Sequence, residues 1–360
     1  MCRSCSIYCV VPPVVFERIA KNGSPEQREW AVETVSRDNS LRVARIQNSL
    51  LRAGGPIRAD ALAATEPGQP KRTVYDAKNL EQVTGEVVRA EGGPAVGDET
   101  ANEAFDGLGA TYKFWYDLYQ RDSIDDAGLP LDAIVHYGDK YDNAFWDGQR
   151  MVFGDGDGEM FNRFTIALDI IGHELAHGVV ETTANLNYWQ QPGALNEHVA
   201  DVFGSLVKQF KNGETAEQAD WLIGAGLFTD QVQGTGGQPA ALRSMAAPGT
   251  GFDDDVLGKD PQPDHMDKFV ETTQDNGGVH INSGIPNKAF HNVATELGGN
   301  AWEKAGTIWY SALRDPRVKP TARFLTFAKA TGRAANRLFG DGSAEAKTVA
   351  SGWKAVGIEI

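Results

Sequence analysis

The stretch His173-Glu174-Leu175-Ala176-His177 decides how the rest of this chain is interpreted. Two histidines four residues apart lie on one face of a helix, about one turn from each other, so both imidazoles can bind one metal ion. Apolar residues surround the motif at helical spacing: Ile170, Ile171, Leu175, Val179 and Val180. We therefore predict a zinc site on a buried helix, with the carboxylate of Glu174 beside the ion.

A third zinc ligand is expected further along the chain. Glu197 comes twenty residues after His177, and it is spaced i, i+4 with Asp201 in a second helical pattern. A carboxylate from a neighbouring helix can reach the ion and leave its fourth position to water. The pentapeptide can also arise by chance, in which case its histidines are ordinary residues, but the helical context favours the metal site.

From about Thr73 onward the chain resembles the thermolysin family of zinc endopeptidases, because several further motifs follow in the family's order. They are Asn143-Ala144-Phe145-Trp146, Gly154-Asp155-Gly156-Asp157-Gly158, Gly193-Ala194-Leu195-Asn196-Glu197, Leu242-Arg243-Ser244-Met245 and residues 275–284. They look like the substrate-binding edge strand, the turn before the active-site helix, the third-ligand segment, the specificity-pocket arginine and the catalytic histidine. The resemblance implies an α+β fold with a sheet-rich N-terminal lobe, a mainly helical C-terminal lobe and a zinc site in the cleft between them.

The same resemblance implies the catalytic roles. His173, His177 and Glu197 would bind one catalytic Zn²⁺. Glu174, which is not a ligand in this interpretation, would take a proton from the attacking water and pass it to the leaving amine.

Further residues would support this chemistry. Tyr188 and His280 would stabilise the oxyanion, and Asp275 would hold the imidazole of His280. Asp201 would orient the first zinc histidine, and Asn196 would orient the second through its backbone. Taken alone, Tyr188 is more often a half-buried packing residue and His280 a turn histidine. Their positions in the ordered set of motifs favour the catalytic roles.

The expected substrates are peptides and proteins. The substrate backbone would be bound by Asn143, Ala144 and Trp146, and Arg243 would hold it near the primed-side pocket. The walls of that pocket would be apolar: Phe161, Phe164, Ile170 and Leu242. Such walls favour a bulky apolar residue after the scissile bond, since burying it is worth about 1.5–3 kcal/mol.

Composition bounds the fold and the partners. With 360 residues, 41% of them hydrophobic, the chain can form two lobes and an appendage. Its net charge of −15 argues against nucleic acid or an anionic membrane as a partner. Alternating segments predict strands at residues 73–75, 133–137 and 151–153, and helical spacing recurs at 105–119, 195–206 and 302–313.

The N-terminal part predicts a separate element. Ser24 followed by Pro25 and Gln27 predicts a helix toward Val35, and a second amphipathic pattern runs from Ser40 toward Leu51. Residues 54–70 are rich in Gly, Pro and Ala, which is typical of an exposed linker.

This layout, with Cys9 shortly before Pro12-Pro13, resembles the protealysin-like branch of the family, whose members carry a short prosegment. We expect residues 1–52 to form an inhibitory prosegment whose Pro-Pro stretch lies in the cleft. Residues 53–72 would be a linker with the processing site, and residues 73–184 and 185–360 the two catalytic lobes.

The first residues bear on location and on cysteine chemistry. No Sec-type signal peptide is recognised, which predicts a cytoplasmic protein as synthesised, with any export by a non-classical route. Cys2, Cys5 and Cys9 all precede the Pro-Pro motif, so the mature enzyme would have no disulfide. The Cys9 thiolate could occupy the open position of the zinc in the precursor, or these cysteines could be free surface thiols. Cys2 and Cys5 alone are weak evidence for a second metal site.

Calcium is where the chain departs from the family. Asp169 and Asp220 match positions that bind a pair of calcium ions, yet Lys208, Leu222 and Ala225 stand where other carboxylates are expected. Since calcium takes six to eight oxygen ligands, we predict that the paired structural Ca²⁺ site is absent. The Lys208 ammonium would then supply the positive charge near Asp169 or Asp220.

Two other functions are compatible with parts of the pattern. A related zinc aminopeptidase uses the same motif plus a glutamate, but with one residue fewer than the nineteen between His177 and Glu197. A non-catalytic binding protein could keep a structural zinc, although the presence of Glu174, Tyr188 and His280 argues against it.

Overall fold

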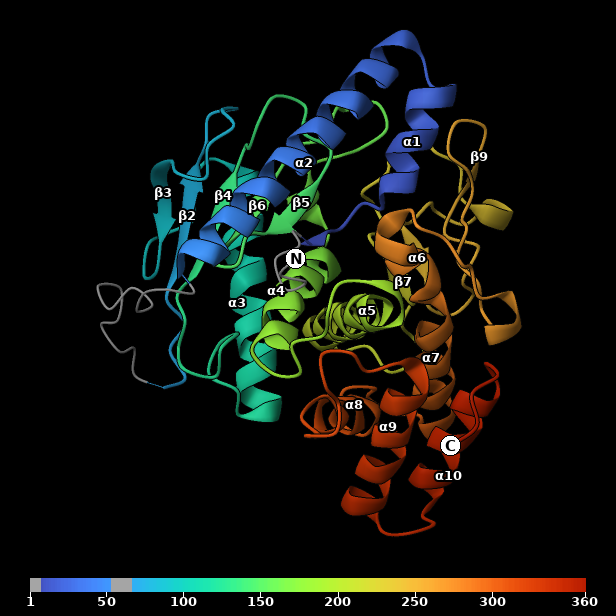
Figure 1. The fold of residues 1–360 in the computed structure, drawn as a ribbon. Coiled ribbons are helices and arrows are strands. Elements are labelled where there is room, and N and C mark those ends of the chain that lie inside the picture. The colour runs from blue at the N-terminus through green and yellow to red at the C-terminus, as the bar shows by residue number, and fades with distance from the viewer. Residues whose placement is uncertain (1–7, 53–66) are drawn as a thin grey trace.

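The computed structural model describes residues 8–52 and 67–360, and only the backbone of Tyr8 and of residues 41–52. The sheet lies in the N-terminal half of the chain, and helices make up most of the C-terminal half (Figure 1). The predicted two-lobed α+β fold is thus confirmed. None of the helices in the described ranges is long and apolar enough to cross a membrane.

The N-terminal lobe is built on a six-stranded sheet with the strand order β1-β5-β6-β4-β2-β3. Its strands are β1 (Tyr8–Cys9), β2 (Arg72–Asp76), β3 (Glu86–Ala90), β4 (Leu131–Val135), β5 (Ala144–Trp146) and β6 (Arg150–Phe153). The strands β2, β4 and β6 are parallel, and the other pairs are antiparallel. The central strands form because they bury β-branched and apolar residues such as Val74, Ile134 and Val152.

The outer strand β1 belongs to the N-terminal segment. It pairs antiparallel with β5, with Tyr8 opposite Trp146 and Cys9 opposite Phe145. The expected substrate-binding edge strand is therefore covered by residues from the start of the chain. An exposed strand edge presents unpaired backbone groups, and β1 covers that edge of β5.

Helices carry the remaining framework. They are α3 (Glu99–Tyr119), α4 (Leu168–Glu181), α5 (Gln190–Asn212), α6 (Asp275–Asn282), α7 (Gly284–Leu297), α8 (Ala305–Leu313), α9 (Phe324–Phe339) and α10 (Ala344–Lys354). Helix α3 begins earlier than its apolar pattern predicts, because the Asp98 side chain caps it by accepting a hydrogen bond from the Ala101 N–H. Short strands lie between α5 and α6: β7 (Leu222–Ile223), β8 (Arg243–Ser244), β9 (Asp253–Asp254) and β10 (Gly258–Lys259).

Helices α4 and α5 approach each other closely because glycine lies at their contact. A β-carbon at Gly204 of α5 would lie 2.3 Å from the carbonyl oxygen of Asp169 and 3.0 Å from the amide nitrogen of His173. Gly172 of α4 lies against the same place, since a β-carbon there would be 3.1 Å from Gly204 Cα. The absence of these side chains brings the two helices near enough to share one site.

The N-terminal segment continues from β1 into α1 (Pro13–Asn22) and α2 (Pro25–Arg52). Pro13 takes the first helical position of α1, where its fixed φ and missing N–H are tolerated. Ser24 and Gln27 exchange two hydrogen bonds, of 2.8 and 3.2 Å, in the predicted capping arrangement. The two helical patterns predicted in α2 form one continuous helix, so the expectation of two was wrong.

The predicted linker lies mostly outside the described residues, as do Cys2 and Cys5. Its predicted end at residue 72 is one residue too late, since Arg72 already pairs with Leu131 in the sheet.

Candidate active site

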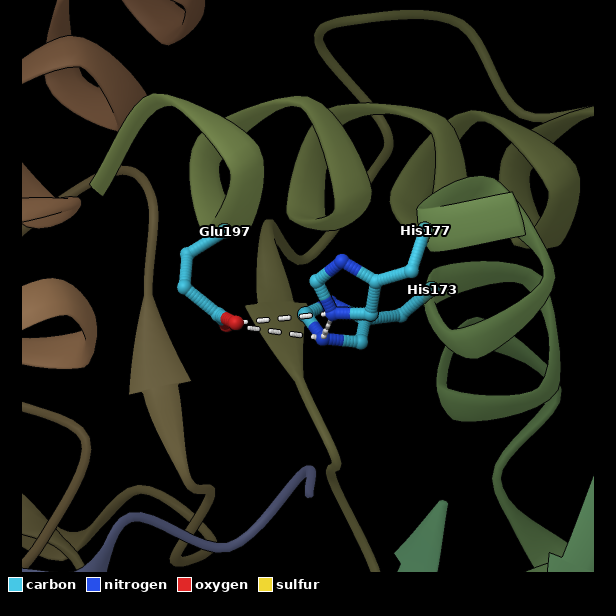
Figure 2. Close-up of side chains that lie close together, drawn as sticks. All are labelled: His173, His177 and Glu197. Carbon is cyan, nitrogen blue, oxygen red and sulfur yellow. Dashed lines mark hydrogen bonds and ion pairs between the residues drawn. The ribbon is translucent and has the colours of Figure 1, made fainter. Parts of the chain in front are cut away.

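The three predicted zinc ligands converge between α4 and α5 (Figure 2). Their ligand atoms all lie within 4.8 Å of one another. His177 Nε2 is 3.1 Å from His173 Nε2 and 3.4 Å from Glu197 Oε1. All three side chains are fully buried.

The surroundings of these side chains fit a metal ion. His177 Nδ1 lies 2.8 Å from Asn196 Oδ1, and His173 Nδ1 lies 2.9 Å from Asp201 Oδ1. With each Nδ1 directed at an oxygen atom, the Nε2 atoms face each other and a carboxylate. Within the described residues, the buried Glu197 Oε2 accepts no hydrogen bond. Converging lone pairs in a buried place are unfavourable unless a cation lies between them, and a two-histidine, one-glutamate set suits zinc.

Asp201 forms a buried network behind the first histidine. Its carboxylate accepts hydrogen bonds from Arg243 Nε at 3.0 Å, Arg243 Nη2 at 2.8 Å and Asn287 Nδ2 at 2.8 Å. Burial alone would raise the pKa of Asp201, but the Arg243 guanidinium and His173 hold it well below its ordinary value. The sequence interpretation missed Asn287, whose only signal is a polar residue on the buried face of α7.

Glu174 follows the metal ligand His173 on α4 and contacts the sheet. Its Oε2 accepts a hydrogen bond of 3.0 Å from the backbone N–H of Trp146, the last residue of β5. This contact ties the predicted general base to the predicted substrate-binding strand. The orientation of Asn196 differs from the prediction, because its side chain and not its backbone contacts His177.

Tyr188, His280 and Asp275 form a connected group beside Glu197. The Tyr188 hydroxyl donates to Glu197 Oε1 and lies 3.2 Å from His280 Nε2. His280 Nδ1 lies 2.6 Å from Asp275 Oδ1, and the backbone N–H of His280 donates to Asp275 Oδ2 at 2.8 Å. Burial would lower the pKa of His280, but the carboxylates of Glu197 and Asp275 raise it above its ordinary value.

The start of α6 is bent in a way that makes this group possible. Gly277 and Gly278 have φ angles of 83° and 76°, in the left-handed region that favours glycine. The turn places the Asp275 carboxylate beside the imidazole five residues later.

The N-terminal segment occupies the front of this site. Val10 N–H donates to Ala144 O at 3.3 Å, and Val11 N–H donates to Asn143 Oδ1 at 3.2 Å. Arg243 Nη1 donates to Val10 O, and His280 Nε2 lies 3.1 Å from Cys9 O. Residues 9–11 thus make the contacts that were expected of the Pro-Pro stretch, although Pro12 lies beside them, lining a small cavity with Leu242 and His280. The metal-ligand group of the described residues does not include the Cys9 thiol.

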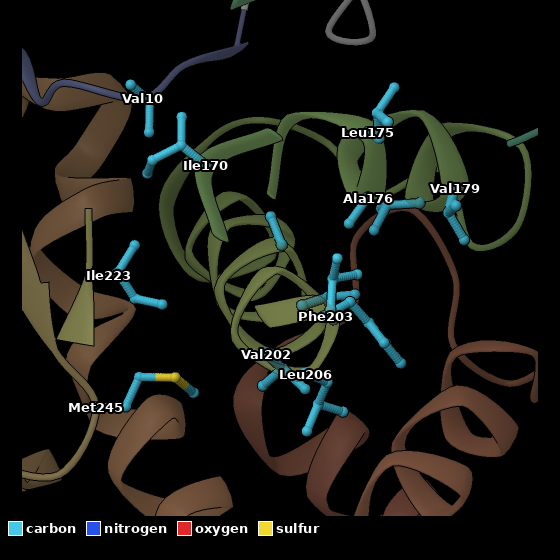
Figure 3. Packing of buried hydrophobic residues seen from close by; sticks show 14 of the residues in the cluster. Val10, Ile170, Leu175, Ala176, Val179, Val202, Phe203, Leu206, Ile223 and Met245 are labelled. Carbon is cyan, nitrogen blue, oxygen red and sulfur yellow. The ribbon is translucent and has the colours of Figure 1, made fainter. Parts of the chain in front are cut away.

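The predicted pocket residues are buried and pack against the same segment. The rings of Phe161 and Phe164 are stacked with centroids 5.8 Å apart, and Phe16 of α1 lies 6.1 Å from Phe161. Ile170 points toward Val10 in the core (Figure 3). Leu242 lines the small cavity beside the N-terminal segment.

A second polar cluster joins the same two helices. Lys208 Nζ lies 3.0 Å from Asp169 Oδ2, 2.9 Å from Asp220 Oδ1 and 2.9 Å from Leu222 O. Burial would lower the pKa of Lys208, but the carboxylates of Asp169 and Asp220 raise it above its ordinary value. The ammonium thus lies between both carboxylates.

A buried two-histidine, one-glutamate metal site with a further carboxylate beside it is the site of a metallohydrolase. Comparison with known proteins identifies the family. Residues 62–181 match the thermolysin metallopeptidase catalytic domain, and residues 184–358 match the thermolysin metallopeptidase alpha-helical domain. The chain therefore belongs to the thermolysin family of metallopeptidases.

Full-length relatives agree with this assignment. An extracellular metalloprotease of Pectobacterium carotovorum subsp. carotovorum is 49% identical over 99% of this chain and 98% of the relative. An extracellular minor metalloprotease of Serratia marcescens is 39% identical over 87% of this chain and 84% of the relative. The solved precursor of protealysin, a metalloproteinase from Serratia proteamaculans, matches with a TM-score of 0.87 and 48% identity, covering 98% of this chain and 99% of that one.

These findings confirm a zinc metalloendopeptidase that is made as a zymogen of the protealysin type. They leave the aminopeptidase and the non-catalytic binding protein without support. The predicted cytoplasmic location is wrong, because relatives of this chain are named extracellular, which points to secretion.

Proposed function

We propose that the enzyme cuts peptide bonds on the N-terminal side of bulky apolar residues, with Glu174 as the general base. The observation that carries this proposal is that Glu174, the residue after the metal ligand His173 on α4, accepts a hydrogen bond from the Trp146 N–H of the substrate-binding strand. His173, His177 and Glu197 would hold a zinc ion, which as a Lewis acid would polarise the scissile carbonyl and acidify water. Glu174 then accepts the proton of that water and delivers it to the leaving nitrogen.

The other site residues hold the substrate and the developing charge. Tyr188 and His280 donate to the oxyanion, and Asp275 keeps the imidazole in place. Asp201 and Asn196 orient the two zinc histidines through their Nδ1 atoms.

The proposed substrate contacts are supported by the hydrogen bonds that Asn143, Ala144 and Arg243 make to the backbone of residues 10 and 11. Asn143, Ala144 and Trp146 would bind the substrate backbone as an added strand, and Arg243 would bind a carbonyl on its C-terminal side. The apolar residue after the cut would enter the pocket formed by the side chains of Phe161, Phe164, Ile170 and Leu242.

The N-terminal segment is assigned to the regulation of activity, and Lys208 to stability. Residues 1–52 act as the inhibitory prosegment, which is supported by the contacts of Cys9, Val10 and Pro12 at the site. A cut in the linker before Arg72 would release it. We also propose that the paired calcium site is absent, because Lys208 occupies the space between Asp169 and Asp220.

The test is a blocked peptide with a bulky apolar residue after one bond, incubated with the linker-cleaved enzyme. We expect cleavage before that residue, inhibition by a zinc chelator, and a fall in kcat of about 10²–10⁴ in Glu174→Gln with zinc content unchanged. Glu217→Gln, an exposed carboxylate beyond the end of α5, is the matched control and should retain full activity. Full activity of Glu174→Gln would contradict the proposed general base.

A further inference from the structure

The prosegment residues at the active site form an ordered series of backbone contacts. Along the chain, Cys9 C=O lies at His280, Val10 N–H at Ala144 and Val10 C=O at Arg243. The next N–H, of Val11, then reaches the Asn143 side chain. Every backbone polar group from the Cys9 carbonyl to the Val11 amide is therefore held by a residue assigned here to substrate binding or to the oxyanion.

The Cys9 carbonyl occupies the reactive position in this series. His280 Nε2, 3.1 Å from Cys9 O, is also 3.2 Å from the Tyr188 hydroxyl and 3.5 Å from Glu197 Oε2. The carbonyl oxygen thus lies at the imidazole that the proposed mechanism uses as an oxyanion donor, next to a metal ligand. The peptide bond that follows this carbonyl joins Cys9 to Val10.

The residue after that bond fits the expected primed side. The Val10 side chain is fully buried and lies near Ile170 of the apolar pocket (Figure 3). Arg243 donates to the carbonyl of the same residue at 3.2 Å. Val10 therefore takes the place of the residue on the C-terminal side of a cut.

We propose that the prosegment binds in the direction of a substrate, with the Cys9–Val10 peptide bond at the position of the bond to be cut. This inference rests on the proposed function. A peptide of this sequence is hydrolysed there: water supplies a hydroxyl to the Cys9 carbonyl carbon and a proton to the Val10 nitrogen as the C–N bond breaks. The prosegment is then an inhibitor because of how it is anchored, and not because of its direction or register.

Anchors on both sides of the bond explain why the attached prosegment resists hydrolysis. On the N-terminal side, Tyr8 and Cys9 are paired with β5. On the C-terminal side, Arg18 of α1 donates to Leu257 O at 2.6 Å and to Lys259 O at 2.8 Å. New chain ends held in place cannot diffuse apart, so their high effective concentration favours re-formation of the bond.

Helix α2 adds a further anchor on the catalytic lobe. Asp38 accepts hydrogen bonds from the Tyr141 hydroxyl at 2.5 Å and from Asn143 Nδ2 at 3.0 Å. The second contact orients the Asn143 amide so that its oxygen faces Val11. A short peptide that ends before Arg18 lacks that anchor and α2, so its fragments can leave.

The test supplies the linker-cleaved enzyme, separated from its prosegment, with a blocked peptide of residues 6–17 and identifies the products by mass spectrometry. We expect fragments ending at Cys9 and beginning at Val10. A Cys9→Ala peptide should be cut at the same bond, since the carbonyl and not the thiol is used. Cleavage only at another bond, or inhibition without cleavage, would overturn the proposal.

A Val10→Asp peptide is the specificity control, and its kcat/KM should fall at least ~10-fold because the apolar pocket rejects a charge. In the full chain, Val10→Asp should raise the activity of the uncut precursor, whereas Val32→Asp should not, since Val32 on α2 is 59% exposed. Equal activity of the two precursors would contradict the assigned register. If the general apolar substrate is cut and the residue 6–17 peptide is not, this inference alone fails. If neither is cut, the proposed function fails.

Discussion

Helices α4 and α5 hold two polar clusters that differ in the source of their positive charge. At the active site, two imidazoles and the Glu197 carboxylate direct lone pairs at one point, which an exchangeable ion can fill. At the second cluster, the chain supplies the cation itself, since Lys208 lies between Asp169 and Asp220. A covalently attached ammonium can balance charge but cannot act as a Lewis acid. We infer that a metal ion is retained at the active site, where the chemistry requires a Lewis acid. At the second cluster, where the positive charge only stabilises the fold, the Lys208 ammonium replaces the ion.

The largest expected effect is the loss of the exchangeable cation. Glu197→Gln removes the negative ligand, so zinc affinity should fall by about 100-fold or more and activity should fall with it. Metal content after dialysis against a zinc buffer measures the first effect, and peptide hydrolysis measures the second. Glu217→Gln, an exposed carboxylate beyond the end of α5, should change neither. Unchanged zinc content in the Glu197 variant would show that the third ligand lies elsewhere.

Removal of the Lys208 ammonium should lower the free energy of unfolding. Lys208→Met leaves the buried Asp169 carboxylate without its ammonium, which should cost about 2–3 kcal/mol, reduced from a fully buried pair because Asp220 is half-exposed. Urea unfolding monitored by fluorescence measures this loss, while zinc content should stay constant.

The reverse substitution tests calcium directly. Lys208→Glu places a third carboxylate beside Asp169 and Asp220, so calcium should raise the Tm of this variant. Neither calcium nor a calcium chelator should change the Tm of the protein without this substitution. A calcium-dependent Tm in the unchanged protein would mean that the proposed absence of the paired site is wrong.

The zinc ligands could be predicted from the sequence, whereas some contacts around them could not, for physical reasons. Periodic apolar residues place His173 and His177 on one helix face, so the ligand set could be proposed before any contact was known. Periodicity identifies a face but not the partner on it, which is why the Asn287 to Asp201 hydrogen bond was missed. The pairing of β1 with β5 joins residues more than 130 positions apart, and two residues of strand carry no pattern that could reveal it.

A change in the close approach of α4 and α5 should affect both clusters, but less than the loss of either positive charge. Gly204→Ala puts a β-carbon where backbone atoms of Asp169 and His173 now lie, so the helices must separate slightly. We expect a loss of about 1–3 kcal/mol in stability together with weaker zinc binding. Gly97→Ala, with no atom within 4 Å of the added carbon, is the control. A destabilised variant with unchanged zinc affinity would show that the spacing of the helices does not set the ligand geometry.

A third cluster in the N-terminal lobe carries a positive charge that depends on pH, and its effect should be the smallest. His136 Nδ1 lies 2.8 Å from Asp155 Oδ2, and its Nε2 lies 2.9 Å from Asp98 Oδ2, the carboxylate that caps α3. The Asp155 hydrogen bond, opposed by burial and aided by Asp98, raises the pKa of His136 from 6.5 to about 9.

A raised folded-state pKa stabilises the protein fully below about 6.5, and this contribution is lost as the pH rises through about 9. His136→Asn keeps a residue that tolerates the positive φ of 54° but cannot become charged. Because both carboxylates are about one-third exposed, we expect the variant to be less stable by only about 1 kcal/mol at pH 6. The difference in unfolding free energy should shrink toward zero at pH 10, whereas a difference independent of pH would show that His136 is neutral throughout and acts only as a hydrogen-bonding residue.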